Sequence, residues 1–132
     1  MLTLFVVPSM KGNANSKKTA ESFLRMETEC NVALVSSWRD VNNHKDKDEW
    51  VGVVWDNEYI DDHLVKALPI YFSYQKYEAL ILYKKVSMVD AVWRYRFFRR
   101  GIYLNTDFSP SHMWLNKEVV LDGWILEHDY PS

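Results

Sequence analysis

The segment that decides the fold covers residues 50–61 and reads WVGVVWDNEYID. Its apolar half, Trp50–Trp55, predicts a buried strand, and the polar turn that follows puts Asp56 and Glu58 at the exposed end of that strand. Two carboxylates one residue apart can share a hard divalent cation, which in turn neutralises the phosphates of a nucleotide. A surface turn that caps the next helix accounts for the same residue types, so spacing alone leaves both interpretations open.

The residues before this segment predict a parallel pair of strands. Residues 2–7 and 31–36 are apolar runs, and Asn15 or Ser16 can cap a helix that continues to about residue 26. We expect Ala20, Phe23 and Leu24 to form the inner face of this helix. Strand, helix and strand in this order predict a right-handed crossover between parallel strands.

The residues after this segment predict further sheet structure. A short helix is expected over residues 62–68, with Leu64, Val65 and Leu68 facing inward and Pro69 near its end. Strands are expected at residues 79–83, 93–98 and 124–126, and the polar residues 39–49 predict a loop. The fold class is therefore α/β: one domain over residues 1–132, with a mixed sheet flanked by helices. In such a sheet, ligands bind beyond the carboxyl ends of the parallel strands, where residues 8–11, 36–40 and 56–58 would emerge.

Composition limits the class of protein. A chain of 132 residues with 48% hydrophobic content can form one compact core, and a net charge of -2 argues against a general polyanion-binding surface. The single cysteine, Cys30, excludes an intramolecular disulfide and a cysteine-based zinc site, which is compatible with a reducing cytosol. No segment predicts a membrane span or an export signal, so we expect a cytoplasmic protein. The many aromatic residues leave a homo-oligomer open.

The order of these segments resembles the family-2 glycosyltransferases of the GT-A fold. LFVVPSM followed by the helix KKTAESFLRM resembles the first strand and helix of that family, and WVGVVWDNEYID resembles its strand ending in a DXD-type motif. RYRFFRRGIYL resembles the family's "LFRR" strand, and GWILEHDY resembles a closing segment that brings a histidine toward the metal. These similarities span most of the chain and imply a reduced GT-A domain.

The resemblance implies a site for a nucleotide-sugar donor. Asp56 and Glu58 correspond to the DXD-like carboxylates and His128 to a third ligand of Mn²⁺ or Mg²⁺, although Glu58 stands where the family has its last Asp. Asp40 lies near the position of an acid that hydrogen-bonds the nucleotide base. We further expect contacts to the donor from Pro8 and from the neighbouring arginines Arg99 and Arg100.

Glycosyl transfer with inversion also needs a carboxylate or imidazole that takes the acceptor proton. The candidates are Asp107, His112 and Glu118, which lie in the region where the family places acceptor-side residues, and no motif chooses among them. The acceptor itself stays open between a glycan, a protein and modified DNA.

The arginines of residues 94–100 support an alternative function. Guanidinium groups bind phosphate bidentately and neighbouring aromatic rings can stack on bases, which predicts a non-catalytic module that binds nucleic acid or a protein partner. Strict alternation instead places Trp93, Tyr95 and Phe97 on a core face and Arg94 and Arg96 on a solvated face.

The chain is short for a GT-A catalytic domain, because only some fifty residues precede the acid motif and a strand-helix unit is missing. This length fits a minimal transferase, a transferase that a partner protein completes, or a degenerate relative that binds without turnover. Such economy suggests a phage protein that acts in the host cytoplasm.

Overall fold

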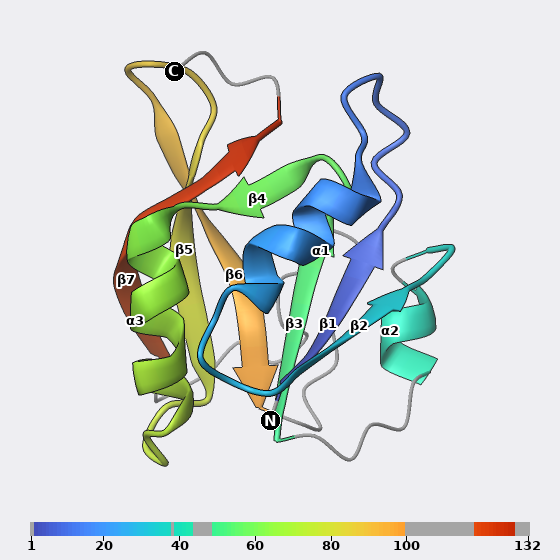
Figure 1. Ribbon diagram of the computed structural model, residues 1–132. Helices are drawn as coiled ribbons and strands as arrows, with labels where there is room; N and C mark the ends of the chain where they lie inside the picture. Colours follow the sequence, from blue (N-terminus) through green and yellow to red (C-terminus); the bar gives the residue numbers. More distant parts are fainter. Residues whose placement is uncertain (1, 38, 44–48, 100–117, 129–132) are drawn as a thin grey trace.

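The structure is a computed structural model that describes residues 2–37, 39–43, 49–99 and 118–128 (Figure 1). Three helices are described: α1 (Ser16–Leu24), α2 (Arg39–Asn43) and α3 (Asp62–Phe72). Seven strands form one sheet: β1 (Leu2–Val7), β2 (Cys30–Leu34), β3 (Trp50–Trp55), β4 (Glu58–Ile60), β5 (Ala79–Lys85), β6 (Ala91–Arg99) and β7 (Glu118–Glu127). Their order across the sheet is β2-β1-β3-β6-β5-β7-β4, so the predicted α/β class and mixed sheet are confirmed.

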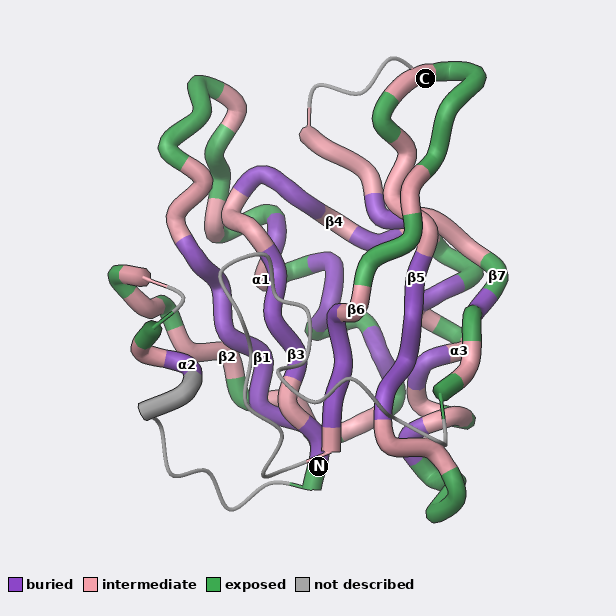
Figure 2. Tube along the Cα trace, turned by 180° about the vertical axis from the view of Figure 1, so that it is seen from behind, coloured by how far each residue is buried: buried purple, intermediate pink, exposed green. Residues whose placement is uncertain are grey.

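Strand β1 lies between two parallel neighbours, β2 and β3, which confirms the predicted parallel pair. Every residue of β1 is buried, because apolar clusters cover both faces of the sheet at this point (Figure 2). Leu4 belongs to the cluster under α1 and α3, and Phe5 belongs to the opposite cluster with Val41 of α2. An uninterrupted apolar run is the pattern expected of a parallel strand that is buried on both faces.

Helices α1 and α3 lie on the same face of the sheet (Figure 1). Phe23 is the main apolar anchor of α1, whereas Leu24 is 55% exposed, so its predicted place on the inner face is wrong. Leu24 lies about 100° further around the helix than Phe23 and therefore turns away from the sheet. The small polar residues Thr19 and Ser22 are buried in its place.

Helix α3 is one turn longer than predicted, because Pro69 lies inside it and does not end it. Phe72 in the last turn packs on Trp50 and Phe97, with ring centroids 5.3 and 5.4 Å away, and this contact favours the added turn despite the proline. The predicted loop over residues 39–49 is also wrong at its start, where residues 39–43 form α2.

A β-bulge at Arg96 changes the expected alternation of β6. Leu80 pairs with Phe97 and the next residue, Ile81, pairs with Tyr95, so the register between β5 and β6 skips Arg96. A bulge re-aims the side chain of the extra residue. Arg96 is consequently 1% exposed, and the prediction that it lies on a solvated face is wrong.

Strand β7 carries a second irregularity at residues 122–123, where Gly123 has a φ of 118°. Beyond it, β7 pairs antiparallel with the edge strand β4, a segment that the sequence suggested to be a turn. Asp61 then caps α3 through its bond from the Leu64 amide and also accepts the Trp124 amide. Within the described part of the chain, no helix has the length and apolar character needed to cross a membrane.

Candidate functional site

The carboxyl ends of β1 and β3 meet at a topological switch point. The chain goes from β1 to β2 on one side and then returns to β3 on the other side of β1. Val7 and Trp55 are paired at the ends of these strands, so the residues that follow them, Ser9 and Asp56, are neighbours in space. In open α/β sheets, ligands bind in the crevice outside such a point.

Asp56 is held in place at this crevice. Its Oδ1 accepts hydrogen bonds from the Ser9 amide at 2.9 Å and the Ser9 hydroxyl at 2.6 Å, and its own amide donates to Val7 at 2.9 Å. Among the described residues, Asp56 Oδ2 has no hydrogen-bond or ion-pair partner. The half-buried carboxylate is therefore oriented by one oxygen and can bind a ligand through the other.

Glu58, the second acid of the motif, is fully buried and neutralised by protein cations. Its Oε1 and Oε2 accept bonds from the two terminal nitrogens of Arg96 at 2.6 and 3.0 Å, and Lys84 Nζ lies 2.6 Å from Oε2. The Trp55 amide also donates to Oε1 at 2.8 Å. Burial raises the pKa of Glu58, but the charges of Arg96 and Lys84 outweigh burial and hold its pKa below the ordinary value.

The crevice is a hollow of about 240 Å³ lined by Ser9, Lys11, Trp55, Asn57 and Lys84. Next to it, Lys11, Gly12, Asn13 and Glu127 line a more open hollow of about 580 Å³.

Glu127 connects these two hollows. Its Oε1 accepts from Asn13 and Asn57 at 3.2 and 2.9 Å, and its Oε2 lies 3.4 Å from Lys84 Nζ. Asn57 is 1% exposed, and its Oδ1 is buried without a hydrogen-bond partner in the described structure.

His128 lies on the other side of the turn formed by Asp56 and Asn57, facing α1. Its Nε2 lies 3.0 Å from Thr19 Oγ1 and 3.2 Å from the Asn15 carbonyl oxygen, and its ring stacks on Tyr59. The described residues contain no group of three or more His, Cys, Asp or Glu side chains arranged to hold a metal ion. The predicted ligands Asp56, Glu58 and His128 thus do not form one three-ligand centre among the described residues, and the binding of Mn²⁺ or Mg²⁺ stays a prediction.

The predicted donor contacts are dispersed. Pro8 immediately precedes Ser9 at the crevice. Asp40 follows β2 and accepts bonds from the Ser36 hydroxyl and the Ser37 amide, which lower its pKa in that order of effect.

Arg99 lies at the opposite end of the sheet, about 20 Å from Asp56 along β3, because it pairs with Trp50. It contacts Glu49 and the carbonyl oxygens of Tyr74 and Tyr77. Arg100 lies outside the described residues.

Of the three predicted catalytic bases, Asp107 and His112 also lie outside the described residues. Glu118 begins β7, about 30 Å along the strand from Glu127, and accepts a hydrogen bond from the Tyr95 hydroxyl at 2.7 Å. Burial, followed by this hydrogen bond and the negative charge of Glu118, raises the pKa of Tyr95 to about 12.

Two side chains of the crevice, Ser9 and Asn57, lie within the predicted ligand-binding loops but received no role of their own, whereas Lys84 of the crevice and Glu127 of the neighbouring hollow were not predicted. Ser9 and Lys84 each follow a predicted strand, and Glu127 precedes a singled-out histidine, so position at a strand end was the available signal. Neither the models of known protein families nor the sequences of curated proteins give a match to this chain.

Proposed function

We propose that the chain is a small glycosyltransferase and that its crevice binds the diphosphate of a nucleotide-sugar donor. The observation that carries this proposal is the Asp56 carboxylate, which Ser9 orients at the switch point while leaving Oδ2 available. Lys11 lines both hollows and can contact donor phosphate. The sequence resemblance to GT-A enzymes supports the same assignment.

The charges around the crevice explain why a cation would assist donor binding. Three cationic and three anionic side chains compensate one another: Lys11, Lys84, Arg96, Asp56, Glu58 and Glu127. A donor diphosphate therefore meets little net positive charge from the protein alone. Mn²⁺ or Mg²⁺, held by Asp56, would supply positive charge to the leaving diphosphate. Glu58 then acts as a positioning residue, because it orients Lys84 and the Trp55 amide beside the crevice.

The alternative function, a non-catalytic module that binds through residues 94–100, has less support. Arg96 is buried against Glu58, and Arg99 is engaged with main-chain carbonyls and stacked on Trp50. Arg94 is the one exposed arginine of the described part of this segment. A single exposed guanidinium is a weak basis for a phosphate-binding surface.

Thermal unfolding with a panel of nucleotides and nucleotide sugars, each with and without Mn²⁺, tests the proposal. A donor at about 100 times its Kd adds about 2.7 kcal/mol to the free energy of unfolding, which is about 9 °C in Tm for a chain of this size. Asp56→Asn keeps the acceptor for Ser9 but removes the charge, so we expect it to abolish the Mn²⁺-dependent shift and sugar transfer.

Asp122→Asn is the matched control, because Asp122 is an exposed acid on β7 that makes no hydrogen bond with Ser9. We expect this variant to keep both the shift and the transfer. A donor-induced shift that is equal in Asp56→Asn and in the parent protein contradicts the proposal.

A further inference from the structure

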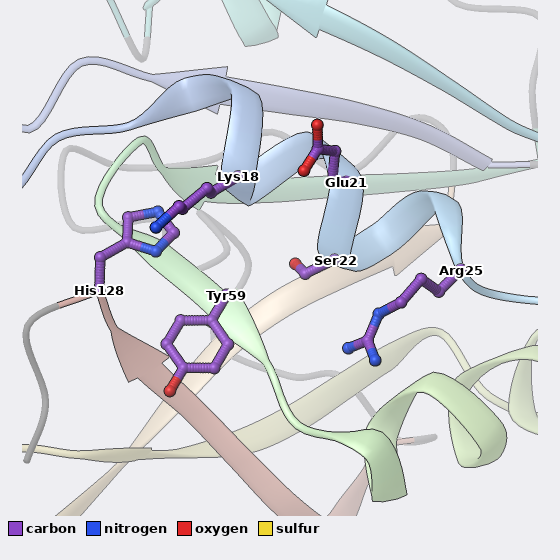
Figure 3. Close-up of a pocket in the computed structure, with 6 residues that line it drawn as sticks. All are labelled: Lys18, Glu21, Ser22, Arg25, Tyr59 and His128. Carbon is purple, nitrogen blue, oxygen red and sulfur yellow. The ribbon is translucent and has the colours of Figure 1, made fainter. Parts of the chain in front are cut away.

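A third hollow of about 380 Å³ lies between α1 and β4, and we call it the groove (Figure 3). The groove contains only one residue, His128, for which the sequence predicts a role. It is lined by Lys18, Glu21, Ser22, Arg25, Tyr59 and His128. Its volume is within the range of small-molecule sites, and it shares no lining residue with the crevice.

The hydrogen bonds of His128 determine which ring nitrogen carries the proton. The Asn15 carbonyl oxygen, 3.2 Å from Nε2, can only accept a hydrogen bond. Thr19 Oγ1, 3.0 Å from Nε2, donates its single proton to the Asp56 carbonyl oxygen and so also acts as an acceptor toward the ring. Nε2 must therefore carry the hydrogen, and in the neutral imidazole Nδ1 has an available lone pair.

Nδ1 of His128 can therefore accept a hydrogen bond. No described residue forms a hydrogen bond with it. The imidazole is also fixed in orientation, since it stacks on Tyr59 with ring centroids 5.6 Å apart and an angle of 8° between the planes. A ligand that donates to Nδ1 therefore meets an acceptor that is already positioned.

The remaining side chains of the groove offer both donors and acceptors with little net charge. Lys18 and Arg25 donate, and Glu21 accepts. Arg25 is paired with Asp62 at 2.7 Å, so two positive and two negative charges balance at this surface. A strongly charged ligand gains little from such a balance, whereas hydroxyl groups can use both kinds of partner.

We propose that the groove binds a hydroxyl-rich ligand, a saccharide, with one hydroxyl donating to His128 Nδ1 and others contacting Lys18 and Glu21. The stacked rings of Tyr59 and His128 both line the groove, so an aromatic surface lies beside these hydrogen-bonding groups. This site is separate from the crevice, so saccharide binding in the groove does not depend on the donor proposal.

Long-range ¹H–¹⁵N NMR of the histidine rings tests both parts of the inference. His128→Gln assigns the His128 signals among the four histidines. We expect the Nε2–H tautomer, and a shift of the Nδ1 signal when methyl β-glucoside or maltose is added. Inorganic phosphate, the anionic probe, should leave that signal unchanged at matched ionic strength.

Lys18→Ala should raise the saccharide Kd about tenfold, the lower limit of the effect of losing one hydrogen bond to a charged group. Lys17→Ala is the matched control, because Lys17 is an exposed neighbour on α1 that does not line the groove. The Nδ1–H tautomer, a response to phosphate alone, no response to either sugar, or equal effects of the two lysine variants each overturn the proposal.

Discussion

The buried carboxylate of Glu58 provides the sharpest test of how this structure works. Glu58→Gln preserves side-chain volume and removes the negative charge that compensates Arg96 and Lys84. In Gln, an NH₂ group replaces one carboxylate oxygen. This group can only donate hydrogen bonds, so it cannot accept those that the oxygen accepted from Arg96 or Lys84. Arg96 is 1% exposed and loses its ion pair with Glu58.

Removing one partner of a buried ion pair costs about 3–5 kcal/mol, because the other charge stays buried without compensation. The entropy of unfolding for 132 residues is about 0.3 kcal/mol/K near Tm, so Tm should fall by about 10–17 °C. Urea unfolding at pH 7 measures the same loss in free energy. Glu27→Gln, at an exposed position, should stay within about 0.5 kcal/mol of the parent protein.

The pH dependence of stability provides a second test of the role of Glu58. The folded-state pKa of Glu58 is lowered, so its contribution to stability is present above its unfolded pKa of about 4.3 and is lost as the pH falls through the folded value. The difference in stability between the parent protein and Glu58→Gln should therefore shrink below about pH 4.

Arg96→Met, alone and combined with Glu58→Gln, measures the coupling directly. The double variant should be more stable than the sum of the two single effects predicts, by about 1 kcal/mol or more. A Glu58→Gln protein with parental stability that fails to bind Mn²⁺ would refute this reasoning, because it would assign Glu58 to the metal and not to the ion pair.

Two further predictions concern packing and titration. Gly52→Ala should lower the free energy of unfolding in urea by about 1–3 kcal/mol, because the added Cβ would lie 2.7 Å from Phe97 Cε1. Gly12→Ala is the control and should have little effect, since no atom lies within 4 Å of its added Cβ. Equal stabilities of the two variants would contradict the packing. Ultraviolet titration, read as the difference between the parent protein and Tyr95→Phe, should give a Tyr95 pKa of about 12, lowered by Glu118→Gln. Because the folded-state pKa of Tyr95 is raised, the contribution of Tyr95 to stability is present below about pH 10 and disappears as the pH rises through 12. Ionisation of Tyr95 near pH 10 would disprove its contact with Glu118.

Several elements followed directly from local sequence patterns. Both Leu2–Val7 and Trp50–Trp55 have the boundaries that were predicted, because a strand buried on both faces needs a mostly apolar run. The place of Asp56 at the carboxyl end of β3, beside the residues that follow β1, follows from the same runs and from the parallel pairing.

Local patterns failed where a distant partner decides the structure. Pro69 predicted a helix end, but the packing of Phe72 against Trp50 and Phe97 extends α3 beyond it. Tyr95 and Phe97 were expected on one face of β6, yet the bulge at Arg96 shifts the alternation, and Tyr95 stacks on Phe98 instead.

The sequence by itself determined the α/β class, the central parallel strands and the position of Asp56, because these depend on the order and length of apolar runs. Only the tertiary structure decided the roles of Glu58 and His128. Glu58 stands two positions from Asp56, but Arg96 and Lys84, 38 and 26 positions further along the chain, reach it across the sheet and neutralise its charge. His128 turns to α1 because Thr19 and Asn15 accept its proton there. A short motif cannot reveal such long-range partners, since its spacing is the same whether an acid binds a ligand or a buried arginine.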